Sequence, residues 1–161
     1  MKSGRILHII YFIFLTTLVI SFASCDKYRF YEKNKEIKDG VWNRSEVIRF
    51  EVPVNDTLFR YNFFVNIRNS TDYGFANLFL FLNTIYPDHK ISRDTLECLL
   101  ADREGKWYGH GMGDIKTCRI MIKKGLRFPQ KGLYAFEFEQ GMRVENLKGI
   151  HDIGLRIEKV H

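Results

Sequence analysis

Apolar and polar residues alternate one by one along much of this 161-residue chain, and this period of two limits its fold more than any other feature. Successive side chains of a β-strand point to opposite faces, so alternation indicates a strand with one buried and one solvated face. In the run over 58–68, the odd-numbered residues from 59 to 67 are all Phe, Tyr, Val or Ile. Such patterns predict seven strands, over residues 47–54, 58–68, 75–85, 96–100, 118–122, 134–138 and 153–157.

Turn residues separate these runs, and only a short segment over 142–147 has a helical character. The run over 75–85 is apolar on both faces, which predicts a central strand. Short, regularly spaced antiparallel strands are typical of sandwiches. We therefore predict an all-β protein, an antiparallel β-sandwich of jelly-roll type. Its 45% hydrophobic and 27% charged residues suit one globular domain and exclude a coiled coil, a repeat array or a polytopic membrane protein.

The N-terminal segment has the pattern of a secretory signal peptide. Basic residues in the first five positions precede an apolar run over 6–20, and small residues come next, before Cys25. Fifteen helical residues span roughly 22 Å at 1.5 Å each, which is less than the roughly 30 Å of a bilayer core. The segment therefore suits transient insertion and cleavage.

Cys25 indicates lipid attachment after cleavage, because Ala23-Ser24-Cys25 resembles a bacterial lipobox, although Phe22 stands where Leu is usual. In that motif the Cys is acylated and becomes the new N-terminus. The alternatives are an ordinary cleaved signal and an uncleaved anchor helix. We predict a signal peptide over 1–24, a lipidated N-terminus with a tether over 25–40, and the sandwich domain over 41–161. The expected location is the cell envelope, with the protein held on a membrane and facing the periplasm or the cell surface.

The other two cysteines, Cys98 and Cys118, lie in phase with the apolar residues of their strands, so both are expected to point inward. In an oxidising compartment they could form a disulfide that closes a 19-residue loop. The alternative is a pair of buried free thiols that pack as small hydrophobic groups.

The loop over 101–115 is the densest candidate site, because four glycines surround Trp107, Tyr108 and His110. Exposed aromatic rings on such a loop suit a sugar ring or an apolar partner. The alternative is that Trp107 folds under the sandwich and closes the core. His110 and Asp114 could contribute to a metal site, but two residues do not predict one.

Catalytic motifs are missing from the sequence. It contains no Gly-x-Ser-x-Gly, no His-Glu-x-x-His and no Cys-x-x-Cys, and no phosphate-binding loop. The formal net charge of +6 is spread along the chain rather than clustered, which argues against nucleic acid as the partner. We therefore predict a non-enzymatic protein with no catalytic residues, no cofactor and no metal.

Several sequence blocks together resemble one family. Behind the lipobox they occur in the order YNFFVNIRN over 61–69, YGFANLFLF over 73–81, DTLECLLAD over 94–102 and LKGIHDIGLRIEK over 147–159. This order resembles the GldH gliding-motility lipoproteins of the Bacteroidetes. The resemblance implies an envelope lipoprotein associated with gliding, whose machinery is linked to type IX protein secretion. It assigns a definite role to Cys25 only, as the lipidated residue.

These features support two functional hypotheses. The first is an interaction module that binds protein partners of the motility or secretion machinery through its edge strands or the loop over 105–114. The second is a glycan-binding lipoprotein that uses Trp107, Tyr108 and Trp42 to stack on saccharides.

Overall fold

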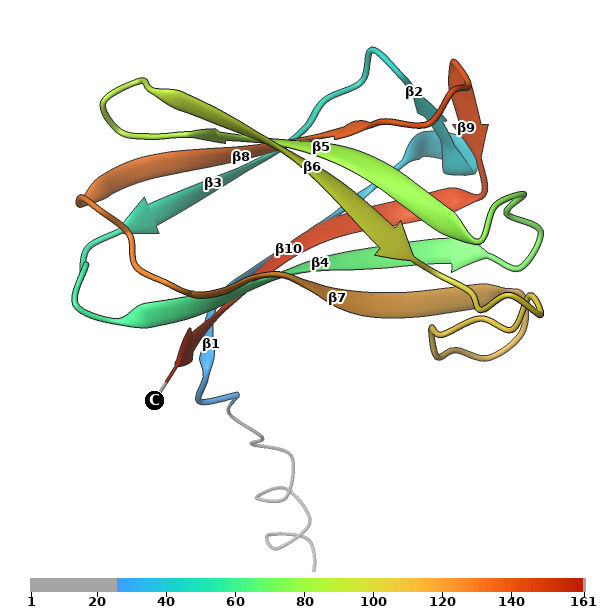
Figure 1. Ribbon diagram of the computed structural model, residues 1–161, viewed down its shortest axis with the longest axis horizontal. Coiled ribbons are helices and arrows are strands. Elements are labelled where there is room, and N and C mark those ends of the chain that lie inside the picture. Colours follow the sequence, from blue (N-terminus) through green and yellow to red (C-terminus); the bar gives the residue numbers. More distant parts are fainter. Residues whose placement is uncertain (1–25, 161) are drawn as a thin grey trace, which may run out of the picture.

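The protein is a two-layered β-sandwich in a computed structural model that describes residues 26–160 (Figure 1). One sheet has the strand order β1-β10-β4-β7, the other has the order β3-β8-β5-β6, and the short strands β2 and β9 pair separately. All pairings are antiparallel. The strands are β1 (Arg29–Glu36), β2 (Val41–Asn43), β3 (Ile48–Val54), β4 (Arg60–Ser70), β5 (Asn77–Ile85), β6 (Ile91–Leu99), β7 (Ile115–Leu126), β8 (Gly132–Gln140), β9 (Asn146–Lys148) and β10 (Ile150–Val160); a short 3-10 turn, η1, spans Lys38–Gly40.

The alternating side chains build one core between the sheets. In β3 every second residue is buried, as the period of two predicts. Aromatic rings join the layers: Phe63 of β4 lies 5.8 Å from Phe136 of β8 between ring centroids. Within the second sheet, Phe50 and Phe138 meet edge to face at 5.9 Å. The all-β sandwich prediction is confirmed, and two four-stranded sheets in this order make a jelly roll.

All seven predicted strands are present, and β5 is central, between β8 and β6. Two predictions were wrong. Residues 29–36 form β1, not a tether, because this strand pairs with β10 along its length, and as an edge strand it leaves most of its charged side chains exposed. The helical candidate over 142–147 is not a helix, since its last residues begin β9, which pairs with β2.

The predicted signal peptide over 1–24 and the lipid site at Cys25 lie outside the described residues. Among residues 26–160 the structure has no helix long and apolar enough to cross a membrane.

Phe138 tests the importance of the core. Its side chain is fully buried, so Phe138→Ala should lower the free energy of unfolding by about 3–5 kcal/mol through lost burial and a cavity. Leu133→Ala is the matched control on the same strand, because Leu133 is 53% exposed and the change should cost within about 0.5 kcal/mol. Urea denaturation measures both, and equal losses would contradict the core assignment.

Candidate functional site

The first described residue, Asp26, contacts a buried arginine on the last long strand. Arg156 of β10 is 5% exposed. Its guanidinium donates hydrogen bonds to carboxylates of Asp26, Glu32 and Glu158, each at 2.5 Å. Three carboxylates around one buried cation leave none of its main donor directions unsatisfied. The residue directly after Cys25 is therefore held on the sheet.

The electrostatics of this site favour the charged forms. Burial opposes the charge on Arg156, but the hydrogen bonds to Asp26, Glu158 and Glu32 outweigh it and raise the pKa of Arg156. The same bond from Arg156 lowers the pKa of the Asp26 carboxyl below its ordinary value of 3.8. Both groups stay ionised at neutral pH, so the contact between them persists there.

The polar network continues across the sheet. Glu32 of β1 also accepts a hydrogen bond from Arg119 of β7 at 3.1 Å. Asn66 of β4 lies between them, since it donates to Glu32 at 3.2 Å and accepts from Arg119 at 3.1 Å. We call Arg156, Asp26, Glu32, Glu158, Asn66 and Arg119 the arginine network. It joins all four strands of the β1-β10-β4-β7 sheet on its outer face.

A shallow polar hollow lies beside the network on the same face. Its volume is about 510 Å³, and Asn34, Arg68, His110 and Asp152 help to line it. Arg68 and Asp152 form an ion pair at 3.0 Å across neighbouring strands. The hollow is open and is lined by charged, polar and apolar groups, which suits the surface of a partner better than an enclosed small ligand.

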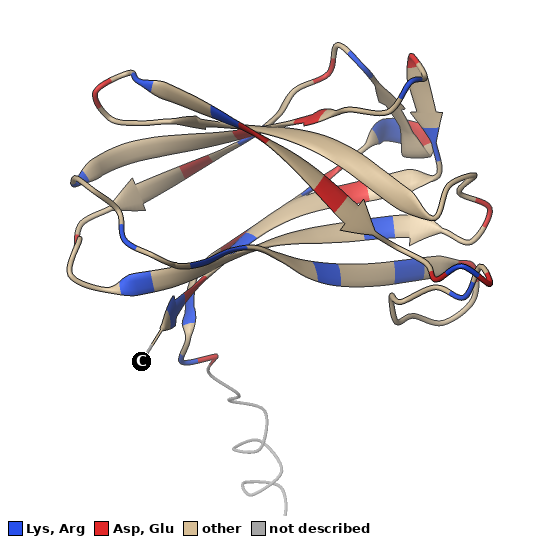
Figure 2. Cartoon of the chain, viewed as in Figure 1, with Lys and Arg blue, Asp and Glu red and all other residues tan. Residues whose placement is uncertain are grey.

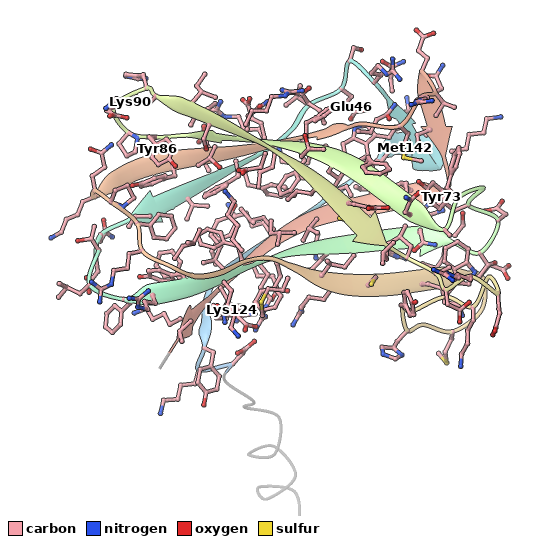
Figure 3. The ribbon with its side chains drawn as sticks, viewed as in Figure 1. Glu46, Tyr73, Tyr86, Lys90, Lys124 and Met142 are labelled. Atoms are coloured by element: carbon pink, nitrogen blue, oxygen red, sulfur yellow. The ribbon has the colours of Figure 1, made fainter. Side chains whose placement is uncertain are left out.

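The loop between β6 and β7 borders this hollow through His110. Trp107 is half-buried against the core and forms a bridge with Ala101. Its ring lies 6.5 Å from that of Tyr73, which is labelled in Figure 3 near the end of the sandwich that carries the loop. Trp107 thus packs against the edge of the core. Tyr108, by contrast, is 52% exposed, and His110 is exposed.

The tip of this loop exposes an apolar side chain on a fixed backbone. Met112 is 97% exposed. Backbone hydrogen bonds in both directions join His110 and Thr117, and the Lys116 ammonium donates to the carbonyls of Gly111 and Gly113 at 3.1 and 3.0 Å. A Cβ at Gly111 would lie 2.2 Å from the carbonyl oxygen of Ile115, so this close turn requires glycine.

The remaining candidate residues are Cys98, Cys118 and Trp42, and each is wholly or partly buried. Cys98 and Cys118 are free thiols on β6 and β7, which belong to different sheets. Burial raises the pKa of Cys98 to about 12, and it also raises that of Cys118. Trp42 is fully buried and donates its ring N–H to the carbonyl of Glu46. It therefore offers no surface for stacking.

Metal-binding geometry is not found in the described part of the chain. No group of three or more His, Cys, Asp or Glu residues there could hold a metal ion, so His110 and Asp114 gain no third ligand of these types.

The arginine network was not predicted from the sequence. Arg156 sits in an alternating strand where a polar residue is expected to face solvent. Strand β1 lies beside Arg156 and helps to bury it. This strand was not predicted, because residues 26–40 are rich in charges of both signs. A strand pattern in FYEKNKE, weak as it is, was the only local signal.

Comparisons with known proteins show the family of this chain. The family model described as GldH lipoprotein matches residues 29–157. The chain belongs to the GldH lipoprotein family. A GldH homolog of Christiangramia forsetii is 37% identical over 92% of this chain and 94% of its own. The gliding motility lipoprotein GldH of Flavobacterium johnsoniae is 36% identical over 90% of this chain and 94% of its own.

Family membership makes the chain a membrane-anchored lipoprotein associated with gliding motility. The matched region begins at the first residue of β1, so the strand that alternation did not reveal is part of the GldH domain. Among solved structures, a chain from the infectious bursal disease virus Gx strain aligns over 83% of this chain and 30% of its own, at 12% identity and a TM-score of 0.30.

Removal of Arg156 should loosen β1. Arg156→Met leaves three carboxylates close together without their cation, and we expect a loss of about 3 kcal/mol in the free energy of unfolding. That value is at the low end for a broken buried pair, because the carboxylates retain some solvent access. Arg49→Met is the control, since its pair with Glu137 is exposed and should be worth under about 1 kcal/mol. Faster hydrogen exchange of β1 amides in the first variant alone would locate the effect, and equal losses would contradict it.

Stability should fall in acid. Hydrogen bonds from Arg93 lower the pKa of Glu139 below its ordinary value of 4.5, and Arg156 and Lys90 lower those of Asp26 and Asp88 below 3.8. A carboxyl with a lowered folded pKa adds stability that is fully present above its ordinary pKa and is lost as the pH falls through the folded value. Unfolding free energies measured from neutral pH to about pH 3 should therefore decline below about pH 4.5. Arg93→Met should weaken this dependence, and a flat profile in the parent chain would contradict it.

Proposed function

We propose that the protein is a non-enzymatic envelope lipoprotein, anchored through acylated Cys25, that serves gliding motility by binding a protein partner. The observation that supports this most is the fixed loop tip, which holds an apolar side chain almost wholly in solvent. The partner is a component of the motility machinery or of the type IX secretion machinery linked to it by the family resemblance.

The loop tip has the properties of a contact surface. Methionine and tyrosine adapt to apolar surfaces and supply much of the binding energy at protein interfaces. Because Lys116 and the His110–Thr117 pairing already hold the backbone, little conformational entropy is lost when a partner binds. The polar hollow beside His110 extends the same surface with charged groups of both signs.

The glycan-binding alternative has less support in the described structure. Of its three aromatic residues, Trp42 lies in the core and Trp107 is half-buried. Tyr108 alone among them has a mostly exposed ring, and one ring is a small platform for a saccharide. We therefore propose a protein partner.

The contact surface can be tested with a double variant. Tyr108→Ser with Met112→Ser should reduce motility and the recovery of cross-linked partners several-fold, because both exposed apolar groups are lost. The unfolding free energy should stay within about 0.5 kcal/mol of the parent. Leu133→Ser, an exposed leucine of the other sheet, is the control and should leave motility unchanged. Full recovery of partners by the double variant would place the contact elsewhere.

The anchor has a test of its own. Cys25→Ala should abolish metabolic labelling with palmitate and release the protein from the membrane fraction, since acyl chains contribute about 0.8 kcal/mol per buried CH₂. Retention of the unlabelled variant in membranes would favour an uncleaved anchor helix instead.

A further inference from the structure

Four strand ends meet where the described chain begins. β1 and β4 start there, and β7 and β10 end there. The register places Arg29 opposite Glu158, Arg60 opposite Val160 and Tyr61 opposite Leu126. Residues far apart in sequence thus form one end of the sandwich, at the lower left in Figure 1.

This end exposes large apolar side chains. Leu58 is 78% exposed, and Tyr28, Phe59 and Leu126 are each more than two-fifths exposed. Lys159 lies over the Phe59 ring, 4.2 Å from its centroid. Aromatic and aliphatic groups beside cations are the composition of surfaces that lie at a membrane–water interface.

The same end is basic. Six cationic residues lie on it, and they are Lys27, Arg29, Arg60, Lys124, Arg127 and Lys159. We call these and the four apolar residues the basic end. Figure 2 shows the blue segments at these strand ends, and Figure 3 labels Lys124 at the lower edge of the molecule, toward the start of β1.

Most acidic side chains near the basic end already bind other cationic side chains. Asp26 and Glu158 bind Arg156, Glu32 binds Arg156 and Arg119, and Asp94 pairs with Lys123 at 2.6 Å. Asp56 accepts the backbone N–H of Leu58 and remains the acid nearest to the exposed leucine. Within residues 26–160, Lys27, Lys124 and Arg127 form no ion pair.

The attachment point brings this surface to a bilayer. Consecutive Cα atoms are about 3.8 Å apart, and Asp26 is fastened to Arg156. A lipid on the preceding residue would therefore leave almost no free tether between the acyl chains and the sheet. Which face meets the membrane is then restricted by the fold itself.

We propose that the basic end rests on the membrane that holds the lipid anchor and binds anionic phospholipid headgroups. This inference rests on the proposed lipidation of Cys25. Each Lys or Arg near an anionic surface adds to the attraction between the protein and that surface. β7 runs from the loop that follows β6 to the basic end, and its 12 residues at about 3.3 Å each span roughly 40 Å. The loop tip therefore projects away from the bilayer toward its partner.

Photo-cross-linking of the full lipidated protein tests this orientation. A photoreactive phenylalanine analogue replaces Leu58 in one sample and Met112 in another. Each protein is reconstituted into phosphatidylcholine vesicles with or without phosphatidylglycerol. We expect phospholipid adducts from position 58 at least several-fold above those from position 112, with a further increase when phosphatidylglycerol is present.

Charge variants separate the basic end from the anchor. Lys27→Gln, Lys124→Gln and Arg127→Gln together should lower the adduct yield at position 58 several-fold and remove its dependence on phosphatidylglycerol and on salt. The matched control removes three exposed cations from the other end of β1 and β10, through Lys38→Gln, Arg143→Gln and Lys148→Gln. It should leave the yield unchanged.

The outcomes are distinct. Equal adduct yields at positions 58 and 112, with Cys25 acylated by mass, would overturn the orientation while the anchor stands. A lipid-dependent yield that both charge variants lower equally would overturn the role of the basic end. Absence of acylation would contradict the proposed anchor and overturn the orientation that depends on it.

Discussion

A buried arginine holds the first described residue of the chain on the sandwich. Arg156 lies on the long C-terminal strand, and the carboxylates that neutralise it come from three separate points, including the first described residue. A charge so little exposed is costly to bury unless every donor finds an acceptor. Correct placement of β1 is therefore a condition for Arg156 to be buried, and the β1-β10-β4-β7 sheet is complete only when that strand is docked.

The contact of Asp26 with Arg156 limits how the domain is oriented relative to the proposed lipid anchor. Lipoproteins on long linkers are free to tumble, and their orientation depends on the partner. Here the chain enters the fold as soon as the described residues begin, at one end of a rigid sandwich. The loop between β6 and β7 and the proposed membrane surface then lie at opposite ends of β7.

The sequence predicted the strands well where burial matches alternation. β3, β4, β8 and β10 each bury apolar side chains at alternate positions, and this alternation can be recognised in the sequence of each strand alone. β1 was missed because it is an edge strand whose outer face is charged, and its stability comes from β10 and Arg156 rather than from its own composition. In the loop, the pattern indicated Trp107, Tyr108 and His110 together. Only packing separates the half-buried Trp107 from the exposed Tyr108. Only the structure distinguishes Met112 as the most exposed large apolar side chain among residues 26–160.

By itself, the sequence determined the all-β class, the positions of seven strands and the family to which the chain belongs. Hydrophobic periodicity and sequence motifs are local properties, so they can be recognised before the structure is known. It also predicted the lipid attachment residue. Tertiary structure alone decided which strands are neighbours, that Cys98 and Cys118 lie on different sheets, and that an arginine in an ordinary alternating strand becomes a buried cation. Those outcomes depend on contacts between residues that are distant in the chain, and Asp26 and Arg156, 130 positions apart, are the extreme example. The composition of a local segment cannot predict these contacts, because whether a residue such as Arg156 can be buried depends on a partner elsewhere in the chain.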